Sequence, residues 1–215
     1  MGIRKNAVKA KVREAFVMAH YRRTGEILIP VAISNRHIHL DRAAADLLFG
    51  PGYTLTKRND VFQPGQYACE ETVTLKGPKG VVRNVRILGP LRKESQVEVS
   101  VTDCYTLGIP PVVRLSGDVL HTPGLFVEGP CGRLQMEFGA IVAGRHLHLS
   151  PEQARLFGLQ NGEMVGLACD GIRPVVFREI VVRVDEAFEL EAHLDTDEAN
   201  AACLKNDMLL RLERR

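Results

Sequence analysis

The pentapeptide Arg36-His37-Ile38-His39-Leu40 occurs a second time in the other half of the chain, as Arg145-His146-Leu147-His148-Leu149. In an extended strand residues i and i+2 point to the same face, so each copy presents two imidazoles side by side. Imidazole is the most common metal ligand among protein side chains. One His-x-His pair is a weak signal, because strands also keep histidines for packing alone. Two copies with matching flanks favour two metal-binding sites.

Both histidine pairs lie directly before a predicted short helix. Asp41 is a good N-cap for a helix that ends near Gly50, and Ser150-Pro151-Glu152-Gln153 is a capping box with proline at the first helical position. Each pair is therefore expected at the end of a strand. Helix N-termini carry unpaired N–H groups and a partial positive charge, so they favour anions. A metal site in this setting suggests phosphate or an acyl phosphate as a ligand.

The composition limits the class of protein. The 215 residues are 45% hydrophobic and 25% charged, as in a globular protein with one large domain or two small ones. The formal net charge of +2 gives no support to nucleic-acid binding. The apolar runs are too short to span a membrane, and no secretory signal is recognised. The five cysteines form no Cys-x-x-Cys, so we expect reduced, mostly buried thiols in a cytosolic protein.

Residues 5 to 22 have the pattern of an amphipathic helix. Val8, Val12, Ala15, Phe16 and Ala19 recur at spacings of three and four, and many of the other positions are basic. Two alternatives stay open for this helix. It is either an ordinary surface helix docked on its own domain or a detachable peptide for targeting or partner binding.

The rest of the chain reads as short strands separated by Gly/Pro turns. Leu91 to Val101 is interpreted as a strand region in which Val97, Val99 and Val101 face one way. On the other face Glu98 is expected to be solvated. Many short strands with few helices predict a mainly β fold of β-barrels capped by short helices.

The last predicted strand ends at a fifth histidine of interest. Leu190, Ala192 and Leu194 lie on one face of this strand, and His193 lies on the other. Asp195, with Glu198 three residues later, can start a short helix. His193 is therefore expected at a strand-to-helix junction, like the two histidine pairs.

Six motifs, in order along the chain, resemble one protein family. They are Arg36-His37-Ile38-His39-Leu40, Gln63-Pro64-Gly65-Gln66, Leu88-Gly89-Pro90-Leu91-Arg92, Gln96-Val97-Glu98, Arg145-His146-Leu147-His148-Leu149 and His193-Leu194-Asp195-Thr196-Asp197-Glu198-Ala199-Asn200. Together they resemble the PduL-type phosphotransacylases, or phosphate propanoyltransferases, from about Pro30 to Ala201. This family is found with bacterial microcompartments that degrade propanediol and related substrates.

The resemblance implies a mainly β fold with two β-barrels capped by short helices and preceded by an N-terminal amphipathic helix. The implied domains are a helix over residues 1–25, a first barrel from residues 26–35 with 144–213, and a second barrel over residues 36–143. The family places its active site between the barrels and holds two metal ions there, usually zinc. It also suggests a homodimer.

The resemblance also assigns roles to single residues. It implies that His37, His39 and Glu98 ligate one metal ion, and that His146, His148 and His193 ligate the other. Arg92 would bind phosphate as a catalytic residue, and Ser116 would be a further phosphate contact. The residues by themselves had indicated the histidines, but not Glu98 or Arg92. Cys69 stands where relatives would have a small residue such as alanine, and no role is assigned to it.

The implied reaction interconverts a short-chain acyl-CoA plus phosphate with an acyl phosphate plus CoA, with propanoyl or acetyl as the acyl group. Coenzyme A, phosphate and acyl phosphate are then the partners. A dinuclear metallohydrolase acting on thioesters or phosphate esters would use the same ligands. A non-catalytic zinc scaffold is a second alternative, although three-residue ligand sets without clustered cysteines argue against a closed structural zinc site.

Family members in microcompartments carry a short amphipathic N-terminal helix. We therefore expect the N-terminal helix of this chain to bind shell or cargo proteins, and the protein to be cytoplasmic, inside a microcompartment. Neither nucleic acid nor a membrane is an expected partner. Because every assigned site residue follows Arg36, deletion of residues 1–22 is expected to leave a soluble, active protein.

Overall fold

The computed structural model describes residues 2–61 and 63–214, with side chains described for all of these except residues 2–7 and 10. Met1, which begins the predicted N-terminal segment, lies outside the described residues. The chain divides into two compact units. Unit 1 comprises Met1–Ser34, Phe62–Pro64 and Gly144–Arg215, and unit 2 comprises Asn35–Val61 and Gly65–Ala143.

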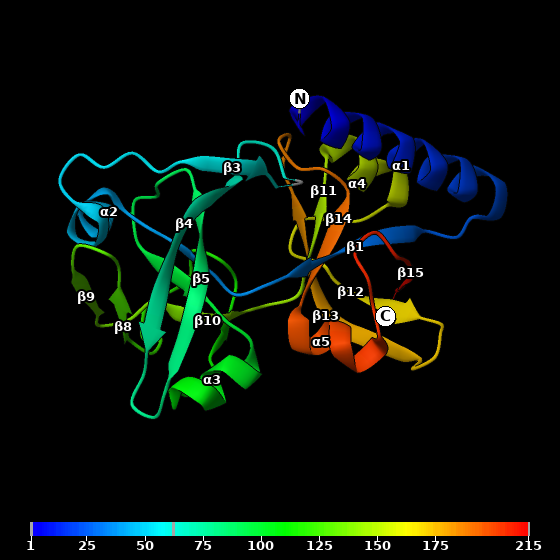
Figure 1. Ribbon diagram of the computed structural model, residues 1–215. Helices are drawn as coiled ribbons and strands as arrows, with labels where there is room; N and C mark the ends of the chain where they lie inside the picture. Colours follow the sequence, from blue (N-terminus) through cyan, green and yellow to red (C-terminus); the bar gives the residue numbers. More distant parts are fainter. Residues whose placement is uncertain (1, 62, 215) are drawn as a thin grey trace. The chain divides into compact units, whose positions relative to one another are not determined.

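The described strands of unit 1 close into a barrel in the order β1-β14-β11-β13-β12-β15 (Figure 1). They are β1 (Leu28–Ser34), β11 (His146–Leu149), β12 (Met164–Cys169), β13 (Val175–Val184), β14 (Glu191–Asp195) and β15 (Leu209–Glu213). The helices of this unit are α1 (Gly2–Thr24), α4 (Pro151–Phe157) and α5 (Thr196–Ala202). Strand β1 comes from near the N-terminus and closes the barrel, because it pairs with β14 in parallel and with β15 antiparallel.

The described strands of unit 2 form an open sheet of nine strands, so this unit is a half-barrel. The strands are β2 (His37–His39), β3 (Lys57–Asp60), β4 (Tyr67–Lys76), β5 (Val81–Gly89), β6 (Gln96–Glu98), β7 (Val113–Arg114), β8 (Leu125–Glu128), β9 (Arg133–Met136) and β10 (Ala140–Ala143). The helices are α2 (Arg42–Phe49) and α3 (Val101–Leu107). The predicted fold class, mainly β with an N-terminal helix, is confirmed, and among the described strands those of unit 1 form a closed barrel whereas those of unit 2 form an open sheet.

Each unit has its own hydrophobic core, and strand alternation sets which residues enter it. Leu147 and Leu149 of β11 are fully buried in the core of unit 1, and Ile38 and Leu40 are fully buried in that of unit 2. Because side chains alternate along a strand, the two histidines of each pentapeptide are turned to the opposite face. Burial of the leucines and isoleucine thus determines where the imidazoles point.

Helix caps follow the strands as predicted. The Asp41 side chain accepts a hydrogen bond from the Ala44 amide at the start of α2. Ser150 begins α4 and Asp195 begins α5, each in a capping box. These caps end the strands beside both histidine pairs and His193.

Only the middle of the predicted strand region from Leu91 to Val101, residues Gln96–Glu98, forms a strand. Strand β6 ends at Glu98, and Val101 is the first residue of α3. The reason is local, because Ser100 and Asp103 form a capping box that favours a helix over a continued strand. The prediction that Glu98 is solvated is also wrong, since Glu98 is buried.

Helix α1 docks on unit 1 through a face that the sequence pattern did not indicate. Val17 is fully buried in the core of unit 1, and Met18 and Tyr21 pack against that core. The Tyr21 ring meets Phe157 of α4 edge-on, and Figure 1 shows the two helices side by side. The predicted apolar stripe is on the outside, with Val8 and Phe16 61% and 55% exposed. Within the described part of the chain, no helix is both long enough and apolar enough to cross a membrane.

Candidate active site

Unit 2 brings together the first predicted ligand set. Strand β2 pairs antiparallel with β6, so His37 lies opposite Glu98 and His39 lies opposite Gln96. One ligand atom from each of His37, His39 and Glu98 lies within 4.8 Å of the others. Backbone carbonyls hold both rings, because Nδ1 of His37 is 2.8 Å from Asn35 O and Nδ1 of His39 is 3.1 Å from Leu88 O. In each imidazole this leaves Nε2 as the nitrogen that can bind a metal.

Unit 1 repeats the arrangement with the second ligand set. Strand β11 pairs antiparallel with β14, so His146 lies opposite His193 and His148 lies opposite Glu191. Ligand atoms of the three histidines lie within 4.8 Å of one another. The rings of His146 and His193 stack with their centroids 4.7 Å apart. In both units the third candidate ligand therefore faces the first histidine of the pentapeptide across an antiparallel pair.

The surroundings of the two histidines in unit 2 shift their pKa values in opposite directions, so that His39 is neutral and His37 is close to the Glu98 carboxylate. Burial, followed by the positive charges of His37 and Arg92, lowers the pKa of His39 to about 3. Burial also lowers the pKa of His37, but the Glu98 carboxylate, 3.5 Å from Nε2, more than offsets this, so the net pKa is raised. A neutral imidazole beside a carboxylate is a donor set that suits a divalent transition metal.

His148 gives the most direct indication that the three histidines of unit 1 could hold a metal ion. Burial, followed by the nearby charges of His146 and Arg183, lowers its pKa to about 3. Among the described residues, none forms a hydrogen bond with either ring nitrogen of His148, although both nitrogens are buried. Phe188 stacks on the ring at 3.9 Å. Burying an imidazole without a partner costs free energy, and a metal ion bound by the three histidines would remove that cost.

Arg92 lies in unit 2, next to the ligand set of that unit. Its Nη1 donates a hydrogen bond of 3.0 Å to Ser116 Oγ, and Gln96 Nε2 donates to the same oxygen at 2.9 Å. Gln96 Nε2 also donates to Glu98 Oε1 at 2.6 Å. A cavity of about 230 Å³ opens beside Arg92, Gln96 and Gly117. The predicted residues Arg92, Ser116 and Glu98 are thus connected through Gln96.

The arginine of each pentapeptide has a structural role that the sequence did not reveal. Arg36 pairs with Asp103 at 2.8 Å, and Arg145 pairs with Glu198. Both acidic residues are in the capping box of the helix that follows the third ligand. Each arginine therefore ties the start of its histidine strand to the neighbouring strand-to-helix junction.

Gln96 and Glu191 are site residues that sequence reasoning missed. Each lies two residues before the third ligand of its unit, on the same face of the strand, and each is buried. This i−2 position was the signal that could have found them. In one sequence it cannot be distinguished from a polar position on a solvated strand face.

The family model for phosphate propanoyltransferase matches residues 30–205, which include both ligand sets, Arg92 and Ser116. The chain belongs to the phosphate propanoyltransferase family. It is therefore an enzyme, a transferase.

Several members of the family are close relatives of this chain. The phosphate propanoyltransferase of Rhodopseudomonas palustris (strain BisB18) is 52% identical over 184 residues, which is 86% of this chain and 81% of the relative. That of Thermotoga maritima is 47% identical over 95% of this chain and 96% of its own length. That of Salmonella typhimurium is 48% identical over 83% of this chain and 85% of its own length. The resemblance drawn from the six motifs is thus confirmed at the level of the family.

Proposed function

We propose that this member of the phosphate propanoyltransferase family interconverts propanoyl-CoA plus phosphate with propanoyl phosphate plus CoA, with acetyl as a second possible acyl group. The observation that carries the proposal is the hydrogen-bonded chain from Arg92 through Ser116 and Gln96 to Glu98. This chain connects the Arg92 guanidinium, a group suited to binding phosphate, with the candidate metal ligand set of the same unit. The names of the relatives support the same reaction.

Each unit would hold one divalent metal ion, with zinc as the first candidate. The donor sets are two imidazoles with a carboxylate in unit 2 and three imidazoles in unit 1. Three protein ligands with an open position are typical of catalytic zinc sites. When bound, such an ion supplies Lewis-acid polarisation of a phosphate or carbonyl oxygen.

The residues of the chain bind phosphate and keep its charge in place. In the forward direction a phosphate oxygen attacks the thioester carbonyl carbon, the C–S bond breaks, and CoA leaves as a thiolate. The Arg92 guanidinium would bind phosphate oxygens with two parallel N–H donors and neutralise their charge. The Ser116 hydroxyl already accepts from Arg92 and Gln96, so its own proton is free to be donated to a phosphate oxygen.

Product analysis separates this reaction from hydrolysis. The purified protein, loaded with zinc, is mixed with propanoyl phosphate and CoA, and the products are separated by chromatography. We expect propanoyl-CoA to form in amounts that match the phosphate released. If only free propanoate appeared, the chain would be a metallohydrolase and the proposed transfer would be wrong.

We also propose that the outer face of α1 docks the enzyme on a shell or cargo protein of a bacterial microcompartment. Its support is the exposed apolar stripe, in which Val8, Val12 and Phe16 are each more than half exposed. Exposed apolar residues at helical spacing are typical of a surface that binds a protein partner. The opposite face of α1 is occupied by unit 1 and is not available to such a partner.

A further inference from the structure

Glu191 is a buried carboxylate on the same face of β14 as His193. It is 3% exposed and lies opposite His148 in the pairing of β14 with β11. Its Oε2 is 3.5 Å from Nε2 of His193. Within the described part of the chain, no residue donates a hydrogen bond to this Oε2, although it is buried. This oxygen is therefore close to one candidate metal ligand, His193.

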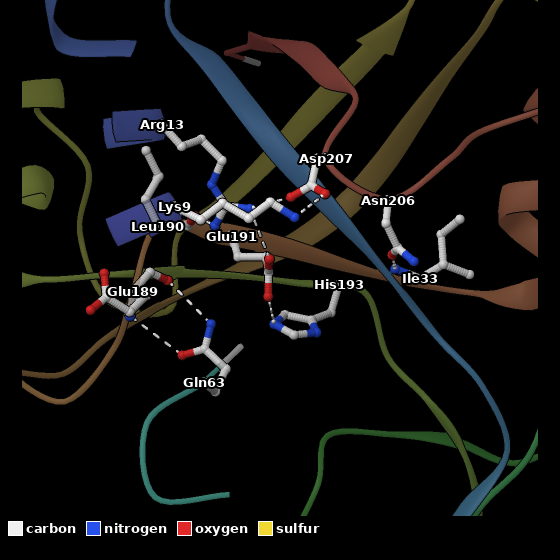
Figure 2. A network of polar contacts seen from close by, with 10 residues as sticks. All are labelled: Lys9, Arg13, Ile33, Gln63, Glu189, Leu190, Glu191, His193, Asn206 and Asp207. Carbon is white, nitrogen blue, oxygen red and sulfur yellow. Dashed lines mark hydrogen bonds and ion pairs between the residues drawn. The ribbon is translucent and has the colours of Figure 1, made fainter. Parts of the chain in front are cut away.

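Arg13 of α1 holds the other oxygen of Glu191. Its Nη1 is 3.1 Å from Glu191 Oε1 and 3.0 Å from Asp207 Oδ1, and its Nη2 donates to Leu190 O at 2.9 Å (Figure 2). The Arg13 side chain is only 10% exposed. The Arg13 guanidinium thus donates to three acceptors in unit 1. These contacts hold the guanidinium in place, and the guanidinium holds the Glu191 carboxylate.

A second segment holds β14 where it begins. The side chain of Gln63 makes two hydrogen bonds with the backbone of Glu189, one to its carbonyl and one from its amide, each 3.3 Å long. Figure 2 shows these contacts on the side of Glu191 that faces away from Asp207. The backbone that carries Glu191 and His193 is therefore held from outside the barrel strands.

The internal repeat indicates what Glu191 does. Gln96 occupies the equivalent position in unit 2, two residues before the third ligand and opposite the second histidine. Gln96 donates a hydrogen bond to the candidate ligand Glu98. A carboxylate ligand needs a donor behind it, whereas a histidine ligand needs an acceptor. Gln96 can donate to the carboxylate of Glu98, and Glu191 can accept from the imidazole of His193.

We propose that Arg13 and Glu191 are positioning residues for His193, an inference that rests on the metal site proposed above. Arg13 binds Glu191 Oε1, so Oε2 is left to accept the Nε2–H of His193. In this tautomer the proton is on Nε2, so Nδ1 would be the nitrogen of His193 that binds a metal. A residue of the N-terminal helix thus acts on the metal site through one intervening carboxylate.

The first measurement is the tautomer of His193 in metal-free protein, read from long-range ¹H–¹⁵N spectra of the imidazoles. We expect the Nε2–H form in the wild type and a mixture of tautomers in Arg13→Gln. Lys9→Gln is the matched control, because Lys9 lies on the same helix and pairs with the same Asp207 at an exposed position. Its spectrum should match the wild type.

The second measurement is zinc affinity, from competition with a chromophoric chelator. Removing the partner behind a histidine ligand typically weakens metal binding by about 10–100-fold. We expect such a loss for Arg13→Gln at one of two sites, with the other site unchanged. Arg13→Lys should recover part of the zinc affinity, because lysine keeps the positive charge but lacks the planar guanidinium with its several N–H donors.

Arg13→Gln leaves a buried carboxylate without its cation, so this variant could fail to fold. The double variant Arg13→Met/Glu191→Met removes both partners of the buried pair, which proteins commonly tolerate. It should also lose the single tautomer of His193. If the folded variants kept the Nε2–H tautomer and wild-type zinc affinity, the proposal would be overturned. If wild-type protein bound no zinc, the proposed function would fail, and the tautomer comparison would still decide the role of Arg13.

Discussion

Arg92 is the residue of unit 2 that we propose binds phosphate. Replacing it with alanine removes charge-assisted hydrogen bonds, which contribute about 1.5–3 kcal/mol. We expect kcat/KM for phosphate to fall by about tenfold to a hundredfold. Arg92→Lys should recover only part of this, because lysine lacks the planar fork. Steady-state rates at varied phosphate and saturating propanoyl-CoA measure the effect.

Arg83 provides the control for this substitution, because it is an exposed arginine on β5 of the same unit. Arg83→Ala should keep wild-type kinetics. An Arg92→Ala enzyme with an unchanged phosphate dependence would show that this guanidinium does not bind the substrate.

His39 should make the metal-free protein sensitive to acid. Its pKa falls from the ordinary value of 6.5 to about 3, mainly because the ring is buried. Below pH 6.5 the unfolded chain therefore takes up a proton that the folded chain does not. Through this residue the free energy of unfolding should fall by about 1.4 kcal/mol for each pH unit from 6.5 toward 3.

Denaturant unfolding in chelator at pH 6.5 and pH 5.0 tests this effect. His39→Gln cannot take up the proton, so its free energy of unfolding should change less between the two pH values. The exposed His121, which has a positive φ, gives the control His121→Asn, with the wild-type pH dependence expected. Equal pH dependence in wild type and His39→Gln would contradict the assignment of a buried, neutral imidazole.

At the residue scale, the sequence predicted the site residues that follow from spacing along one strand, but not those that depend on contacts between distant segments. Each His-x-His pair was predictable because i and i+2 share a face of a strand. Glu98 was proposed only through the family resemblance, since a glutamate between valines is usually solvated. The contact between Arg13 and Glu191 joins residues 178 positions apart. No local pattern reports such a pairing, because it depends on how α1 packs on the barrel.

Helix α1 packs on unit 1 through one face and is exposed on the other, so we now expect its removal to destabilise the protein. Deleting residues 1–22 would expose the core surface that Val17 covers and leave Glu191 without Arg13. Breaking a buried ion pair by removing one partner typically costs 3–5 kcal/mol. We therefore expect the truncated protein to unfold at a clearly lower denaturant concentration than the full chain. A truncated protein with unchanged stability and activity would show that α1 is dispensable.

The outer face of α1 allows the complementary experiment. The triple variant Val8→Ser/Val12→Ser/Phe16→Ser changes exposed positions only, so stability and specific activity should stay near wild type. Delivery into microcompartment shells made in the same cell should be lost. Microscopy of fluorescent fusions of the full chain and the variant measures this. Equal delivery of both forms would exclude the stripe as the docking surface.

At the element scale, caps were predicted better than strand ends. Asp41, Ser150 and Asp195 begin helices as expected, because an N-cap is a local interaction. The region from Gln96 to Val101 alternates like one long strand, yet β6 ends at Glu98 and α3 begins at Val101. Alternation gave the faces of β6 correctly but could not show that the Ser100 cap would end it.

The whole molecule repeats one design in two compact units. In each unit a strand with two histidines pairs with a strand that carries the third candidate ligand, and the arginine of the pentapeptide binds the capping box that follows. The repeat was visible in the sequence only as two pentapeptides, each followed by a capped short helix. Its second half, Gln96-x-Glu98 and Glu191-x-His193, uses different residue types, so sequence similarity could not reveal it.

The central claim is that this transferase moves an acyl group between phosphate and CoA with the help of one metal ion in each unit. The most direct test is a zinc titration of chelator-treated protein, in which propanoyl-CoA formation from propanoyl phosphate and CoA is followed at each step. We predict no transfer without metal and full activity at about two zinc ions per chain, one for each ligand set. Full transfer activity in protein that elemental analysis shows to contain no metal would contradict the claim.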